Sequence, residues 1–249
     1  MSPFFIVSLL LQIACCIHVA RSGRPMYWML LLMVGSYLAV LVYVFVAVLP
    51  DLRHDPSGQR AMRKVRAQLD PGRAARAANR DLQVADTPEN RRRLAEESLR
   101  TGDFARAEEA YRGALRGLYK EDPDLLLGLA RAQHALGRAQ EARDTLQTLR
   151  TANPDFRNHE ADLLEARVLA ETGAMDAALE RFETVSQAYP GEEARVRYGQ
   201  LLRQAGDQAG AAAQFRESLE RSRHAPAYYR REQKSWLDLA RRELAAVQG

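Results

Sequence analysis

A fourfold repeat in the carboxyl-terminal part of the chain constrains its fold more than any other feature. Each copy contains one glycine, and successive glycines lie 35, 36 and 33 residues apart: Gly102, Gly137, Gly173 and Gly206. An alanine follows each glycine after five residues: Ala107, Ala142, Ala178 and Ala211. A bulky apolar residue follows after nine: Tyr111, Leu146, Phe182 and Phe215. A period of this length indicates a supersecondary unit that is used several times.

The pattern within each copy predicts a pair of helices. A small residue lies seven positions before each glycine: Ala95, Ala130, Ala166 and Gly199. Small residues let two helix axes approach closely, and each unit then buries its apolar face against the next. We therefore expect an all-α fold, an α-solenoid of about four helix pairs over residues 86–224. A capping helix over residues 225–249 would close it with one apolar face: Tyr229, Trp236, Ala240, Leu244 and Val247.

These units resemble the tetratricopeptide repeat. Its A-x3-F pattern is matched by Ala178 and Phe182, and its closing proline by Pro154 and Pro190, each 17 residues after a glycine. The first unit departs from the pattern because an insertion moves its proline to Pro123, and the last reaches a proline only at Pro226. The resemblance implies a concave groove, lined by the first helix of each unit, that binds a protein or peptide.

The first 50 residues have a different composition from the rest. They contain two charged residues, Arg21 and Arg24, between apolar stretches at residues 3–20 and 26–49. As helices these stretches would be about 27 and 36 Å long, at 1.5 Å per residue, so we expect a transmembrane helical hairpin over residues 1–50. Two alternatives remain for the first stretch: a signal peptide, or a lipid-modified Cys15.

Basic residues near the apolar segments predict the orientation of the hairpin. Five of them follow Pro50 within about 17 residues, against two in the turn: Arg53, Arg60, Arg63, Lys64 and Arg66. Positive charge favours the cytoplasmic side. We therefore expect a multi-pass protein of the bacterial inner membrane with its repeats in the cytoplasm; the bacterial source is inferred from arginine-rich, lysine-poor usage.

The hairpin weakly resembles the amino-terminal membrane domain of cardiolipin synthases and related phospholipase D proteins, through Trp28, Gly35 and Tyr43. The His-x-Lys-x4-Asp motif of that family does not occur in the chain, so its catalytic activity is not implied.

Residues 51–85 are predicted to be a basic, partly helical linker. Residues 51–80 contain eight Arg and Lys against three Asp. The segment is either a solvated spacer or a surface that lies on anionic headgroups through four residues: Arg60, Arg63, Lys64 and Arg66. Because the basic excess lies in the linker and not on the repeats, we expect no nucleic acid partner.

No catalytic or metal-binding motif is found. His159 and Glu160 begin like a zinc-protease helix, but Leu163 stands where the second histidine would be needed. No nucleophile elbow or phosphate-binding glycine loop occurs. We predict that the protein is not an enzyme and uses neither a cofactor nor a metal.

The candidate binding residues lie on the first helices. Positions ten, six and three before each glycine share one helical face. The position ten residues before is Arg92, Leu127, Leu163 and Val196; the position six before is Glu96, Arg131, Arg167 and Gln200; the position three before is Leu99, His134, Ala170 and Arg203. From these we select as partner-binding residues Arg92, Leu127, Arg131, His134, Leu163, Arg167, Val196 and Arg203.

An apolar strip flanked by arginines suits a peptide with apolar anchors and a carboxylate, which guanidinium groups bind in two places. Alternatively the arginines pair with neighbouring acids such as Glu96 and Glu160. The lysine and asparagine set of chaperone-binding family members is absent, so that partner is not indicated.

Two functions are compatible with this organisation. The first is a membrane-anchored scaffold that recruits a protein or peptide partner to the inner membrane through its groove. The second is an envelope assembly or chaperone factor whose repeats lie in the periplasm, as in the cytochrome c maturation proteins, which however have a long loop between their two membrane helices. Nothing in the sequence identifies the partner.

Overall fold

The computed structural model describes residues 12, 13, 15–17, 19, 20, 32, 42, 70 and 72–248 of the 249-residue chain. Most of the predicted hairpin over residues 1–50, and the linker arginines and lysine at positions 60, 63, 64 and 66, lie outside these residues. No helix among the described residues combines the length and the apolar character needed to cross a membrane.

The chain divides into two compact units, Met1–Arg73 and Ala74–Gly249. The second unit is built from helices, and residues 72–248 contain no strand. In chain order the helices are α6 (Arg73–Val84), α7 (Pro88–Thr101), α8 (Phe104–Ala114), the 3-10 helix η2 (Gly117–Tyr119), α9 (Pro123–Ala135), α10 (Ala139–Ala152), α11 (His159–Glu171), α12 (Met175–Ala188), α13 (Glu193–Gln204), α14 (Gln208–His224), α15 (Ala227–Glu232) and α16 (Lys234–Gln248).

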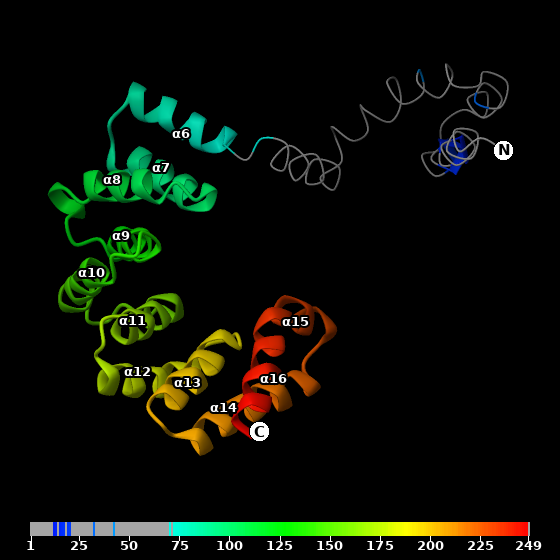
Figure 1. The fold of residues 1–249 in the computed structure, drawn as a ribbon. Helices are drawn as coiled ribbons and strands as arrows, with labels where there is room; N and C mark the ends of the chain where they lie inside the picture. The colour runs from blue at the N-terminus through cyan, green and yellow to red at the C-terminus, as the bar shows by residue number, and fades with distance from the viewer. Residues whose placement is uncertain are drawn as a thin grey trace. The chain divides into compact units, whose positions relative to one another are not determined.

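Helices α7 to α14 form four antiparallel pairs, as the repeat predicts. Each pair turns at a glycine with positive φ, between 76° and 91°, a region that residues with a Cβ rarely enter: Gly102, Gly137, Gly173 and Gly206. The first helices α7, α9 and α11 line the inner side of the arc, and the second helices α8, α10 and α12 lie outside them (Figure 1).

The small and bulky positions of the repeat pack against each other. Ala95, Ala130 and Ala166 have no exposed surface, and the bulky residues of the four units are at most 4% exposed. At Gly199 an added Cβ would lie 2.6 Å from the ring of Phe215, so only glycine fits there without movement. Each small residue thus gives a large neighbour its space, which confirms the predicted packing.

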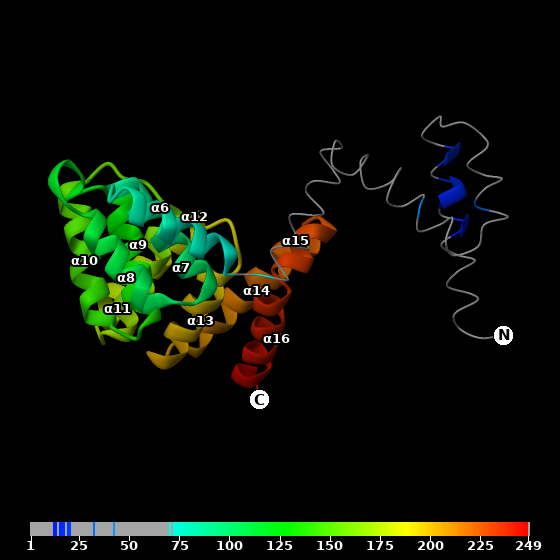
Figure 2. The same cartoon turned by 90° about the horizontal axis from the view of Figure 1, so that it is seen from above.

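Helix α6 belongs to the folded unit. Ala78 is 1% exposed, and together with Leu82 it packs into the cluster that contains Leu94 and Tyr111. Figures 1 and 2 show α6 lying beside α7 at one end of the array. The compact unit therefore starts at Ala74, whereas the sequence predicted that the linker extends to residue 85.

The carboxyl-terminal cap consists of two helices and not of one. Gln233 ends α15 and its side chain accepts a hydrogen bond from the backbone N–H of Glu192, 3.0 Å away. Of the predicted apolar face, Tyr229 therefore lies on α15, and its hydroxyl donates to Glu192 Oε1 at 2.7 Å. The other four residues lie on α16 and pack with Val196 and Phe215. Helix α16 contacts α14 and α13, as α9 contacts α8 and α7.

Asp86, in the turn between α6 and α7, makes the stability of the first unit depend on pH. Hydrogen bonds from Arg91 and then from Arg116, at 2.6 to 2.9 Å, hold the pKa of Asp86 at about 2, below its ordinary 3.8. A depressed pKa stabilises the fold above the ordinary value, and this stabilisation is lost as the pH falls through the lower one.

We expect Asp86→Asn to lower the urea midpoint at neutral pH and to show a much smaller loss at about pH 2, where the wild-type carboxylate is half protonated. Urea titrations of both proteins at several pH values measure this. An equal difference between them at every pH would contradict the assignment.

Candidate binding groove

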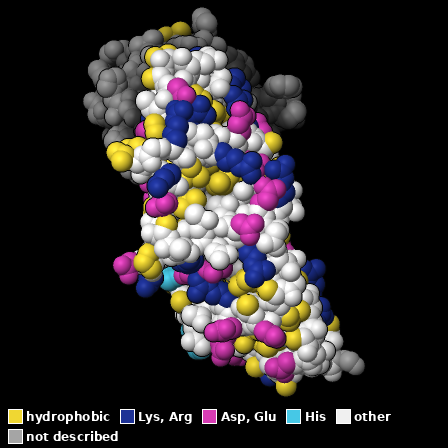
Figure 3. All heavy atoms as spheres, turned by 90° about the vertical axis from the view of Figure 1, so that its left-hand side faces the viewer, with side chains coloured by type: hydrophobic (Ala, Val, Ile, Leu, Met, Phe, Trp, Pro, Cys, Tyr) yellow, Lys and Arg dark blue, Asp and Glu magenta, His cyan; other side chains and the backbone are white. Residues whose placement is uncertain are grey.

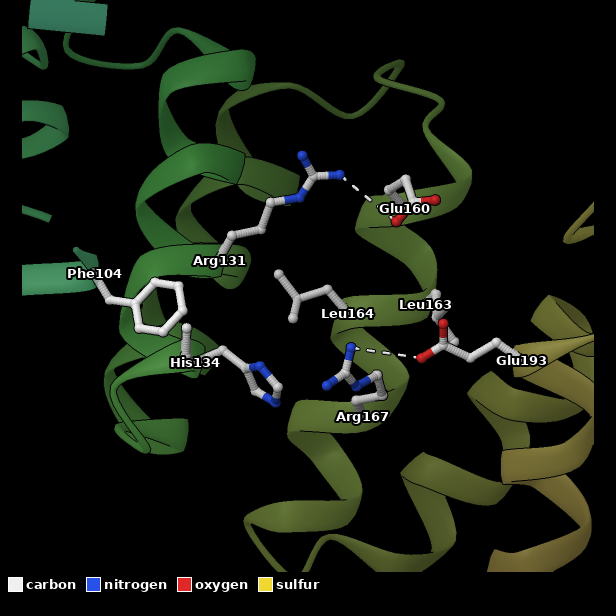
Figure 4. A pocket seen from close by; sticks show the side chains of 9 residues that line it. Phe104, Arg131, His134, Glu160, Leu163, Leu164, Arg167 and Glu193 are labelled. Carbon is white, nitrogen blue, oxygen red and sulfur yellow. Dashed lines mark ion pairs between the residues drawn. The ribbon is translucent and has the colours of Figure 1, made fainter. Parts of the chain in front are cut away.

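A cavity of about 530 Å³ opens on the inner face of the repeats. It lies between α9, α11 and the first turn of α13, with the start of α8 at its edge. Figure 4 shows the side chains around it. Its lining residues are Phe104, Arg131, His134, Ala135, Glu160, Leu163, Leu164, Arg167 and Glu193. The structure thus brings four of the eight predicted binding residues together: Arg131, His134, Leu163 and Arg167.

Local sequence positions these side chains. The Asn158 side chain caps α11 by accepting hydrogen bonds from the N–H groups of Glu160 at 2.9 Å and Ala161 at 3.1 Å. This cap fixes Glu160 in the first helical turn. Leu163 and Arg167 follow three and seven residues later, on the same face of the helix.

Arg131 is held weakly. Its Nη2 lies 3.7 Å from Glu160 Oε2, which is longer than a hydrogen bond. Glu160 accepts a hydrogen bond of 2.9 Å from the hydroxyl of Tyr189 instead. Burial, and then this hydrogen bond, raise the pKa of Tyr189, so the hydroxyl stays a donor at neutral pH.

Arg167 has the same arrangement one unit further along. Its Nη1 lies 3.7 Å from Glu193 Oε1, while that oxygen accepts a hydrogen bond of 2.8 Å from Nε of Arg197. The Nε of Arg167 is buried and has no hydrogen-bond partner. Desolvation and then the nearby Arg197 lower the pKa of Arg167, so its charge is under-compensated in this position.

Each acid therefore has a second, closer donor. Arg131 or Arg167 could thus leave its acid and bind a ligand carboxylate, while Glu160 and Glu193 keep their other hydrogen bonds. Breaking the loose ion pair would then cost little free energy. Arg131 and Glu160 do form an ion pair, as expected from the alternative that the groove arginines pair with neighbouring acids. Because the pairing is loose, it is compatible with a role in binding.

His134 and Phe104 form the side of the cavity towards the glycine turns. The Nε2 of His134 lies 2.9 Å from Glu171 Oε1, and its side chain is 12% exposed. Phe104, at the start of α8, turns its ring towards the cavity (Figure 4). It supplies apolar surface next to the two guanidinium groups, whereas Leu163 and Leu164 line the cavity but are themselves buried, at 3% and 5% exposure.

The other predicted residues lie elsewhere. Leu127 is 4% exposed and Val196 is fully buried, because each faces the second helix of its own unit; they form core rather than the expected apolar strip. Arg92 forks onto Glu89 at 2.8 and 2.9 Å, also reaches Glu96 at 2.7 Å, and lines a separate pocket. Arg203 lies 2.9 Å from Glu243 on α16, which covers this end of the row.

Sequence reasoning missed four residues that complete the cavity: Phe104, Ala135, Leu164 and Glu193. A periodic signal marks one of them, Glu193. An acid occurs thirteen residues before every glycine of the repeat: Glu89, Asp124, Glu160 and Glu193. The position two residues after the glycine is aromatic only in the first unit, at Phe104, and is Ala139, Met175 and Gln208 in the others.

The outer face differs from the groove. Basic and acidic side chains are interspersed over it (Figure 3). A typical cluster joins Arg150 and Arg181 to Asp162 and Glu165 at 2.5 to 3.1 Å, which ties α10, α11 and α12 together. In the part of the chain that the structure describes, no group of three His, Cys, Asp or Glu side chains could hold a metal ion.

Two family models match the chain, both described as tetratricopeptide repeat, over residues 98–168 and 159–226. No curated protein matches the sequence significantly. Solved structures with a similar fold are identical to the chain at about a fifth of the aligned positions. They confirm the all-α solenoid. MamA is 22% identical, with a TM-score of 0.55 over 64% of this chain and 93% of its own. The Thermus thermophilus protein TTC0263 is 22% identical, with a TM-score of 0.52 over 77% and 99%. YrrB, described as having an unusual peptide-binding site, is 19% identical, with a TM-score of 0.51 over 71% and 91%.

Proposed function

Because residues 98–226 place the chain in the tetratricopeptide repeat family, we propose that it recruits an acidic protein or peptide to the bacterial inner membrane through the groove between α9, α11 and α13. Repeats of this family are scaffolds for protein–protein interaction and generally have no enzymatic activity. The partner class and the membrane anchor are the parts of this proposal that go beyond the family.

The observation that carries the proposal is the loose pairing of Arg131 and Arg167 within one cavity. Both guanidinium groups lie 3.7 Å from an acid that another donor already holds. A carboxylate gains two hydrogen bonds from a guanidinium fork, and apolar side chains of the same partner would bury the partly exposed ring of Phe104. The peptide-binding site described for YrrB supports a peptide as one form of this partner.

The membrane anchor is supported by the sequence. Residues 3–20 and 26–49 are long enough and apolar enough for two helices, and the basic residues after Pro50 favour repeats in the cytoplasm. Protease treatment of sealed, oriented vesicles tests this side. Cleavage of the repeats only in inverted vesicles supports it, and cleavage only in right-side-out vesicles would favour the periplasmic alternative.

A photo-crosslinking residue tests the groove. In the full chain we would replace Ala135, which lines the cavity, and as a control Ala213, which is exposed on α14. We expect adducts with an acidic partner in cells only from position 135. Adducts only from position 213 would move the binding surface to the outer face.

A further inference from the structure

The carboxyl-terminal cap reaches the groove through one aromatic side chain. Trp236 lies in the first turn of α16, and the guanidinium carbon of Arg197 lies 4.9 Å from the centre of its ring. At this distance the face of an indole attracts a guanidinium cation. Arg197 belongs to α13, and α16 lies beside α13 and α14 at the end of the array (Figure 2). Trp236 therefore restricts the position of an arginine next to the groove.

Arg197 in turn holds the acid that faces Arg167. Its Nε donates to Glu193 Oε1 at 2.8 Å, and the two residues are one helical turn apart on α13. Nη1 of Arg167 approaches the same oxygen but stays 3.7 Å away (Figure 4). The positive charge of Arg197 is also close enough to lower the pKa of Arg167. Arg197 thus takes the oxygen that Arg167 would otherwise use, and its charge repels Arg167.

The fourth unit shows how close such a pair comes when each donor has an oxygen of its own. Arg203 of α13 lies 2.9 Å from Oε2 of Glu243 on α16, while Gln200 donates to the other oxygen, Oε1, at 2.8 Å. In the groove, by contrast, Arg167 and Arg197 approach one and the same oxygen. Withdrawal of Arg197 should therefore free that oxygen and let Arg167 close onto it.

We propose that Trp236 is a positioning residue of the groove: it keeps Arg197 on its acid and so leaves Arg167 available to an acidic partner. The inference rests on the proposed function, because it concerns one of the two arginines assigned to binding. It makes the cap a part of the binding site as well as a cover for the last unit. Loss of the aromatic ring should release Arg197 and let Arg167 pair with Glu193, which weakens binding of a carboxylate.

The isolated repeats and cap allow this to be tested without the partner. Residues 74–249 form a compact unit with buried clusters of their own. In this fragment we would measure by NMR the exchange of the Arg197 Nε–H with water and the rotation of the Arg167 guanidinium. Binding would be measured with a fluorescent peptide of alternating glutamate and leucine whose two ends are blocked.

Three variants separate positioning from packing. Trp236→Leu removes the aromatic face but leaves an apolar side chain. Trp236→Phe keeps an aromatic face, which also attracts a guanidinium. Leu244→Ala is the matched control, because Leu244 packs with Phe215 in the same cluster as Trp236 and its loss leaves the indole in place.

We expect Trp236→Leu to speed exchange at the Arg197 Nε–H and to slow rotation of the Arg167 guanidinium, each about two- to fivefold, and to weaken peptide binding by a similar factor. Arg197→Met should affect Arg167 and the peptide at least as much. Trp236→Phe should restore most of these properties. Leu244→Ala should lower the melting temperature without changing them.

Unchanged arginine signals in Trp236→Leu, or equal changes in Leu244→Ala, would overturn the inference, because the ring would then serve the cap alone. Equal binding of the peptide by the wild type and by Arg197→Met would overturn it as well, since Arg197 would then not govern Arg167. If the arginine signals change as expected but the wild-type fragment does not bind the peptide, the proposed acidic partner is wrong and the positioning of Arg197 by Trp236 stands.

Discussion

Replacing Ala166 with tryptophan should destabilise the repeats more than any other single change considered. Ala166 has no exposed surface and lies in the cluster formed by Phe182, Val185 and Leu201. An indole cannot enter this space unless α11 and α12 move apart. Overpacking usually costs about 1 to 3 kcal/mol, and we expect a loss of at least about 3 kcal/mol for so large an intrusion.

The matched control is Ala213→Trp on the exposed side of α14, for which we expect a change within about 0.5 kcal/mol. Thermal and urea unfolding of both variants measure the difference. Because each unit is stabilised by its neighbours, the damage should spread to α9–α10 and α13–α14 and broaden the transition. A neutral Ala166→Trp would mean that the small positions of the repeat are wrongly assigned.

Exchanging both Arg131 and Arg167 for glutamate should abolish capture of an acidic partner. The change places two negative charges beside Glu160 and Glu193. The groove, which attracts a partner carboxylate through its two arginines, would then repel that carboxylate. Truncating one partner of a buried charge pair already costs about 2 to 5 kcal/mol, so we expect binding to fall at least about 100-fold. Repulsion between the new carboxylates and Glu160 and Glu193 should lower stability somewhat, but the loss should stay small because no hydrogen bond is removed: neither arginine lies within hydrogen-bond distance of its acid.

The control for this variant is Arg223→Glu with Arg241→Glu, which changes the net charge equally. Both residues are exposed, 71% and 58%, on α14 and α16. Partner capture and melting temperature would be measured for both double variants. A large drop in melting temperature, together with binding that salt does not alter, would show that Arg131 and Arg167 serve the fold and not the partner.

The sequence could predict the repeat fold because its signals are local and periodic. The four turn glycines, the buried alanines and the bulky residues nine positions later are confirmed where the repeat placed them. The break between α15 and α16 could not be predicted in this way. It depends on Gln233 and Tyr229 reaching Glu192, about 40 residues earlier in the chain.

The cavity could be predicted only in part, because only those of its residues that recur at a fixed distance from the turn glycine give a periodic signal. Arg131, His134 and Arg167 were found because their spacing from the glycine is regular. Helical spacing alone does not distinguish a residue that faces solvent from one that faces the second helix of its own unit, so Leu127 and Val196 were included. The donors Tyr189 and Arg197 depend on contacts between successive units, which a single repeat does not contain.

The pairing of a groove arginine with the acid of the following unit has a consequence for how such a groove could evolve. The arginine lies six residues before one glycine, and the acid lies thirteen residues before the next: Arg131 with Glu160, and Arg167 with Glu193. A gene duplication that copied one such unit would insert its arginine and its acid together. The arginine of the copy would pair with the acid of the following unit, and its acid would pair with the arginine of the preceding unit. One duplication would thus add one arginine to the groove together with its acid. Duplicating the first unit would not have this effect, because Glu96 replaces the arginine there.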